Sequence, residues 1–263
     1  MATPRVFEHC TLSELEIDDE RSFRHVSLYA DLKEVLRRAA YPFRILSGDS
    51  AGRADRALLL NLTFWAADAG GDILPGRRLD ADVVAHVAWH HLAARALAVP
   101  GRPLSVDALL VGEAIASAFD VYLVGRLLGH APESSFLETQ VPAMAETAEA
   151  AGLCAEDFQR LLERVASDPD RAFGELYALL FDVTRALLAC DDAALAQAAL
   201  GGFAAHPLVP LLHRYELSNW VLYARAFGDR HEDVRARQAD RAIRSAAVPL
   251  DWLSAHWLAP ALS

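Results

Sequence analysis

Two histidines and one glutamate have the spacing of a metal site. His86 and His90 are four residues apart, which places both imidazoles on one face of a helix. Glu113 follows in a second apolar run. Two imidazole nitrogens and one carboxylate oxygen make a three-ligand set with an open fourth position, and such a set suits zinc. The pattern therefore predicts a zinc site held by His86, His90 and Glu113.

The turn between the two runs brings these residues to the same level. Pro100-Gly101 ends the first helix, and Ser105 can cap the second, so the helices should form an antiparallel hairpin. His90 and Glu113 then each lie roughly 12 Å from the turn, at a rise of about 1.5 Å per residue. A carboxylate in such an apolar run must be paired, ligated or protonated. We expect the three side chains to converge in a dry pocket.

Residues 58–129 resemble the zincin metallopeptidases, in the branch whose third ligand is a glutamate on the following helix. The motif elements are His86-Val87-Ala88-Trp89-His90 and Gly112-Glu113-Ala114-Ile115-Ala116. The resemblance implies ligand roles for His86, His90 and Glu113. The family carries a general-base glutamate directly after the first histidine, and this chain has Val87 there. The resemblance implies a metal-binding protein that is either a divergent metal-dependent hydrolase or a non-catalytic descendant of a metallopeptidase.

Three other residues can replace the missing base. Asp120 lies two turns beyond Glu113 on the same helix face, where it can orient a ligand or activate water. His213 shares a helix face with Glu216 and can act as a donor that folds over the metal. Glu138 is the third candidate. We predict Asp120 and His213 as the catalytic residues. The alternative for Asp120 is a solvated helix charge, and the alternative for His213 is a hydrogen-bonded histidine in a helix interface.

Two further groups near these residues have expected roles. Asp82 lies one turn before His86 and can accept a hydrogen bond from its other ring nitrogen. Trp220 is expected on the His213 face of its helix. His91 is rotated about 100° from His90 and should not share its face.

A metal-free interpretation also fits the histidine pair. With 10 histidines in 263 residues, roughly 0.4 pairs of this spacing arise by chance. A structural His–Glu cluster therefore stays open as the alternative. In that case the chain would be a metal-free helical module for protein interaction or scaffolding. The sequence identifies neither a protein partner nor a small-molecule partner, and it leaves a homo-oligomer open.

Composition excludes several classes of function. The net charge of −11 disfavours binding to nucleic acid and to anionic membranes. No uncharged apolar run reaches membrane-spanning length. The three cysteines are odd in number and far apart, which suits a reducing compartment. We predict a cytoplasmic protein, and the 53% hydrophobic content predicts a packed globule.

The first half should hold both strands and helices. An amphipathic helix is expected over residues 27–40, strands over 43–46, 57–65 and 73–74, and a solvated loop or helix start over the acidic residues 14–20. The helical hairpin that carries the metal residues follows, with Asp80 as the N-cap that accepts free backbone N–H groups.

The second half should be wholly helical. A loop is expected over residues 130–142, and helices over 143–151, 155–166, 171–189, 191–200, 207–227 and 230–246, with an aromatic segment at 250–258. Asp170 and Asp191 are the expected caps of two of these helices. The predicted fold is mainly α (α+β), with a small N-terminal sheet and a zincin-like hairpin. The predicted domains are residues 1–130 and 131–263, with one continuous domain as the alternative.

Overall fold

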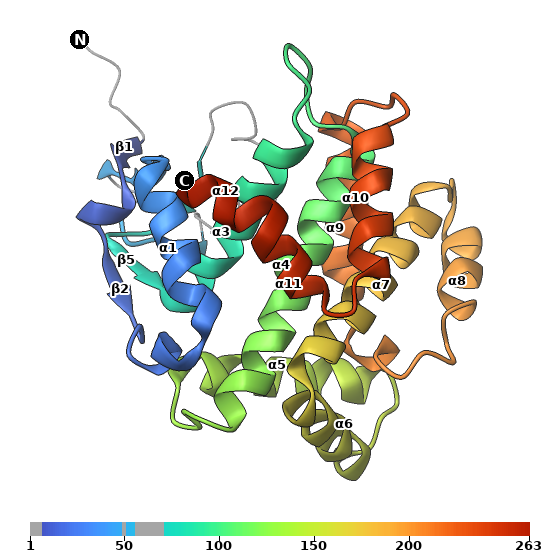
Figure 1. The fold of residues 1–263 in the computed structure, drawn as a ribbon. Helices are drawn as coiled ribbons and strands as arrows, with labels where there is room; N and C mark the ends of the chain where they lie inside the picture. The colour runs from blue at the N-terminus through green and yellow to red at the C-terminus, as the bar shows by residue number, and fades with distance from the viewer. Residues whose placement is uncertain (1–6, 49–50, 56–70) are drawn as a thin grey trace.

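The protein is mainly helical, with a few short strands near its N-terminus (Figure 1). The computed structural model describes residues 7–48, 51–55 and 71–263. The mainly α, α+β fold class is confirmed. The strand predicted over residues 57–65 lies outside the described residues, as does the first part of the segment that resembles the zincins.

In the part of the chain that the structure describes, five short strands form two small sheets. They are β1 (Phe7–Cys10), β2 (Glu16–Asp18), β3 (Phe43–Leu46), β4 (Ile73–Leu74) and β5 (Arg78–Asp80). β3 pairs antiparallel with β1 and parallel with β4, and β2 pairs in parallel with β5. The predictions of β3 and β4 are confirmed. The expectation of a loop or helix start over residues 14–20 is wrong at β2, because pairing with a distant segment makes this strand.

Helices make up most of the described chain. The first half contains η1 (Leu12–Glu14), η2 (Ser22–His25), α1 (Ser27–Arg38), α3 (Ala81–Leu97) and α4 (Val106–Leu128). The second half contains α5 (Ser135–Ala150), α6 (Ala155–Ser167), α7 (Pro169–Leu188), α8 (Ala193–Gly201), η5 (Val209–Leu211), α9 (Arg214–Phe227), α10 (Val234–Ser245), α11 (Pro249–Leu253), the π-helix η6 (Ser254–Leu258) and α12 (Ala259–Leu262).

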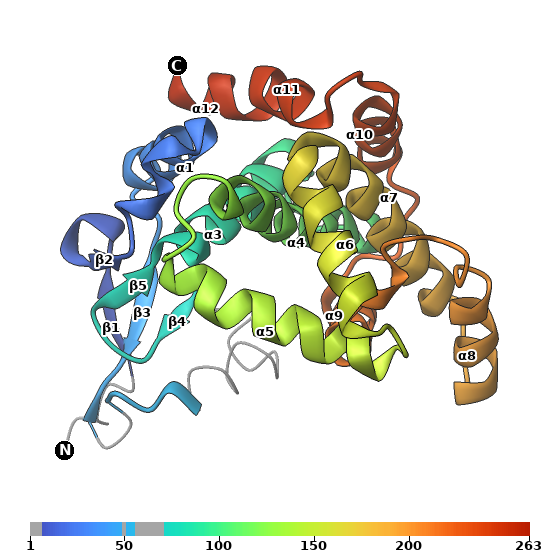
Figure 2. The same cartoon turned by 90° about the horizontal axis from the view of Figure 1, so that it is seen from below.

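Helix α4 is the element around which the others pack (Figure 1, Figure 2). It lies against α3 on one side and α7 on another, and α6 and α9 also contact it. By length and composition it could span a membrane, but 78% of its most apolar 18-residue window is buried inside the protein. This burial is typical of the central helix of a soluble protein. One hydrophobic cluster includes residues from both halves of the chain, from Cys10 to Leu258.

The helical hairpin forms as the capping residues predict, with one exception. The Ser105 side chain accepts a hydrogen bond from the backbone N–H of Ala108 at 3.0 Å and so caps α4. Gly101 has φ +75° in the connection, a backbone conformation that glycine adopts without strain. Asp80 is the N-cap residue of α3, but its side chain makes no capping hydrogen bond, so that part of the prediction is wrong. Burial raises the pKa of Asp80 instead.

Pro142 lies inside α5 rather than before it. The loop predicted over residues 130–142 is wrong, because α5 begins at Ser135 and contains Pro142 in its interior. An interior proline costs about 3 kcal/mol through a lost hydrogen bond and a steric clash. The helix buries Phe136 before Pro142 and Met144 after it, and this packing on both sides offsets the cost.

Four other helix starts in the second half also differ from the predictions, and one of them is α10, which begins at Val234 rather than at residue 230. The caps of α7 and α8 are Asp168 and Asp192 rather than Asp170 and Asp191. The helix predicted over residues 207–227 begins only at Arg214, because residues 207–213 form turns and the short helix η5. The C-terminal aromatic segment packs back on the protein, with Trp257 buried and α12 beside α1 (Figure 2).

Candidate metal centre

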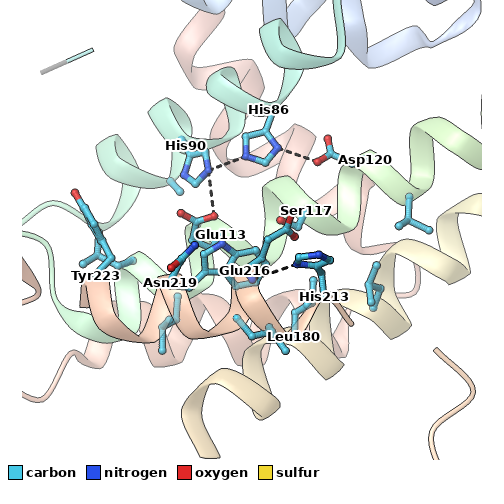
Figure 3. A pocket seen from close by; sticks show the side chains of 18 of the residues that line it. His86, His90, Glu113, Ser117, Asp120, Leu180, His213, Glu216, Asn219 and Tyr223 are labelled. Atoms are coloured by element: carbon cyan, nitrogen blue, oxygen red, sulfur yellow. Dashed lines mark hydrogen bonds and ion pairs between the residues drawn. The ribbon is translucent and has the colours of Figure 1, made fainter. Parts of the chain in front are cut away.

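Helices α3 and α4 bring the three predicted ligands together. His86 and His90 point from α3 toward Glu113 on α4 (Figure 3). The Nε2 atoms of the two histidines are 3.2 Å apart, and His90 Nε2 is 3.6 Å from a Glu113 carboxylate oxygen. One potential ligand atom from each residue lies within 4.8 Å of the other two. The predicted convergence of His86, His90 and Glu113 is present in the structure.

These separations match the edges of a metal coordination polyhedron. Zinc–nitrogen and zinc–oxygen bonds are about 2.0–2.2 Å long, so two ligands of a tetrahedral zinc lie roughly 3.3–3.5 Å apart. The 3.2 Å and 3.6 Å contacts fall close to that range. The residues present therefore fit a small divalent ion such as zinc.

Asp120 fixes the orientation of the first histidine. Its carboxylate oxygen lies 2.9 Å from His86 Nδ1. A carboxylate on Nδ1 holds the ring so that Nε2 faces His90 and Glu113, as outer carboxylates do for histidine ligands of metals. The same contact contradicts the role predicted for Asp82, which makes no hydrogen bond to His86 because Asp120 occupies that nitrogen. Asp82 is instead a half-buried carboxyl whose pKa is raised to about 7, by desolvation first and then by the Asp120 charge.

The ionisable side chains of the site have shifted pKa values. Burial lowers the pKa of His86, but the Asp120 carboxylate outweighs that effect and raises it overall. Burial and then the nearby His86 charge lower the pKa of His90. Burial raises the pKa of Glu113 to about 7. A neutral imidazole at His90 is the form that binds a metal ion.

The three ligands border a cavity of about 550 Å³. Their side chains are 31%, 34% and 28% exposed for His86, His90 and Glu113. The expectation of a dry pocket is therefore wrong, because solvent reaches the ligands through the cavity. The apolar lining contains residues of α4, α5 and α7, among them Leu109, Met144 and Leu180.

Helix α9 forms the wall opposite the ligands (Figure 3). His213, Glu216 and Trp220 all line the cavity, so the face predicted for His213 is present although His213 lies before the helix rather than within it. His213 is the N-cap residue, and its Nδ1 accepts the backbone N–H of Glu216 at 3.3 Å. This bond leaves the ring proton of the neutral form on Nε2.

Sequence reasoning missed several polar residues of the cavity, among them Asp72 and Asn219. Asp72 precedes β4 and accepts a hydrogen bond from the Tyr41 hydroxyl at 2.8 Å. Asn219 lies on α9 and lines the cavity between His90 and Tyr223 in Figure 3. The helical period places Asn219 one turn beyond Glu216, which was the available signal. No local pattern points to Asp72.

Three other residues discussed in the sequence analysis lie away from the cavity lining. Glu138 is exposed on α5 and is not among the lining residues. Val87 is 4% exposed, and it too does not line the cavity. His91 packs against Tyr41 with ring centroids 5.5 Å apart, which confirms that it is off the ligand face. A glutamate at position 87 would therefore enter the core rather than the cavity.

Comparisons with known proteins return no relative. No protein family, no curated protein and no solved structure matches this chain. The resemblance to the zincins stays a prediction that depends on the three ligand residues and their setting.

Proposed function

We propose that the protein binds one zinc ion through His86, His90 and Glu113 and is a divergent metal-dependent hydrolase of a small molecule. The observation that carries this proposal is the position of the three ligands at the edge of a cavity of about 550 Å³. Ligand cavities of proteins commonly measure about 300–1,000 Å³. Zinc held there would supply a Lewis acid that polarises a carbonyl or activates water.

The donor set supports a reactive rather than a structural ion. Structural zinc sites are closed by four protein ligands, whereas catalytic sites keep a position open. Within the described residues, the group that can hold a metal has three members, and all three line the cavity. The fourth position is therefore available to a molecule in the cavity.

Two further residues of the chain have distinct proposed roles. Asp120 is a positioning residue, because its carboxylate is bonded to His86 rather than directed at a bound molecule. His213 lines the cavity with its Nδ1 occupied by a backbone N–H, so its Nε2–H can donate a hydrogen bond to a bound molecule.

Elemental analysis of untagged protein tests the metal site. We expect about one zinc per chain in the wild type and loss of that zinc in His86→Ala. His91→Ala is the matched control, because His91 is the next histidine on the same helix and lies off the ligand face. Wild-type protein that stays free of metal after incubation with zinc would contradict the proposal. That result would favour the metal-free helical interaction module.

A further inference from the structure

Helix α9 presents two polar groups to the cavity that make no side-chain hydrogen bond in the described chain. The Glu216 carboxylate makes no hydrogen bond or ion pair with any described residue, although its backbone N–H is bonded to His213. The Asn219 Nδ2 is buried and also has no hydrogen-bond partner in the described chain. The two residues are three apart on one helix and both line the cavity. One acceptor and one donor therefore lie side by side, available to a ligand.

The other acidic groups of the cavity already have partners. Asp72 accepts the Tyr41 hydroxyl, and Asp120 is bonded to His86. Glu113 belongs to the metal-binding group. Glu216 is thus the cavity carboxylate that remains available for a bound molecule.

The charge of the lining selects against anions. Asp72, Glu113, Asp120 and Glu216 line the cavity, and no lysine or arginine occurs among the described lining residues. A divalent ion would neutralise only part of this charge. The carboxylates therefore attract a cationic group and repel a carboxylate or phosphate.

The remaining lining is largely apolar. Beside the polar groups lie side chains from four helices, which include Leu109, Met144, Leu176, Leu180 and Trp220. Such walls favour an aliphatic or aromatic body on the ligand.

We propose that the cavity binds an apolar primary amine that carries a neutral carbonyl group close to the amine. Glu216 accepts hydrogen bonds from the ammonium group, and Asn219 donates one to an oxygen of the same molecule. The apolar walls contact the body of the ligand. This inference deepens the proposed function and rests on it, because the metal ligands form the opposite wall of the same cavity.

Titration calorimetry with three related probes tests the inference on zinc-loaded wild-type protein. The probe is L-leucinamide, which has the amine, the carbonyl and an apolar body. The first control, 4-methylpentanamide, lacks the amine, and the second control, N-acetyl-L-leucine, is an anion. We expect L-leucinamide to bind at least about tenfold more tightly than either control, because charge-assisted hydrogen bonds contribute about that much.

Variants of α9 assign the contacts. Glu216→Gln should weaken L-leucinamide binding about tenfold or more, and Asn219→Ala should weaken it less, since a neutral hydrogen bond contributes less than a charged one. Ser218→Ala is the matched control on the same helix, because Ser218 is exposed and bonds only the Arg214 carbonyl. Glu216→Gln should leave the affinity for 4-methylpentanamide unchanged.

Equal affinity for L-leucinamide and N-acetyl-L-leucine, or unchanged binding in Glu216→Gln, would overturn the inference. Zinc content is measured on the same samples and separates the two proposals. Stoichiometric zinc without Glu216-dependent amine binding would overturn the inference alone. Glu216-dependent amine binding to a wild type that holds no zinc would support the inference and overturn the proposed metal site.

Discussion

The two walls of the cavity are built differently. The wall formed by α3 and α4 belongs to the core, and its polar groups contact one another, as His86 does with Asp120 and His90. The wall formed by α9 buries only three residues, Leu217, Val221 and Ala224, and it presents the Glu216 carboxylate and the Asn219 amide nitrogen to the cavity without a side-chain hydrogen bond in the described chain. Fixed geometry suits a metal ion, whereas unpaired groups suit a ligand that comes and goes.

The largest expected effect is a loss of global stability when the core wall is opened. Phe119 on α4 is fully buried, and its ring lies against Trp89 on α3 at 5.5 Å between centroids. Phe119→Ala should lower the free energy of unfolding by about 3–5 kcal/mol. Chemical denaturation measures this. Leu217→Ala on α9 is the comparison and should cost about 2 kcal/mol, at the low end for a buried leucine, because α9 can move to fill the space. An equal loss of unfolding free energy in the two variants would show that the two walls are equally rigid.

Hydrogen exchange should separate the walls without any mutation. The amides of α4 are expected to exchange only through global unfolding, whereas those of α9 should exchange about 100-fold faster through local opening. Mass spectrometry of exchanged peptides measures both. Similar protection in the two helices would contradict the comparison.

Neutralising the Asp120 carboxylate should lower the affinity for zinc without abolishing zinc binding. Asp120→Asn keeps the size of the side chain but loses the charge on His86 Nδ1, so zinc affinity should fall about 10–100-fold. Competition with a chelator measures the affinity. Ser117→Ala, one turn earlier on α4 and also in the cavity lining, is the control and should leave it unchanged. A full effect in both variants would argue for a general disturbance of α4.

The smallest expected effect is a pH dependence of stability that comes from Asp82. Because the folded pKa is raised from 3.8 to about 7, the folded protein holds a proton that the unfolded chain releases over that interval. The contribution of Asp82 to the free energy of unfolding of the metal-free wild type should therefore fall as pH rises from 4 to 7. Asp82→Asn should match the wild type at pH 4 and exceed it by about 1–2 kcal/mol at pH 8, after allowance for solvent screening. Parallel pH profiles of the two proteins would contradict the assignment.

Local rules accounted for the elements that hold the metal ligands. The spacing of His86 and His90, the cap at Ser105 and the short turn at Gly101 are set by neighbours in the sequence, and they place Glu113 level with His90. The strands β3 and β4 were likewise readable from short apolar runs between turns. Where a strand depended on a partner far away, as β2 does on β5, local patterns failed.

The sequence by itself determined the helical hairpin, its ligand face and the mainly helical fold, because helical periodicity and capping act over a few residues. Only the tertiary structure decided that Asp120 rather than Asp82 contacts His86, and that Asn219 and Asp72 share its cavity. Packing also overrode the break expected at Pro142 and delayed the start of α9 to Arg214. These outcomes depend on contacts between segments distant in sequence, which no local pattern records.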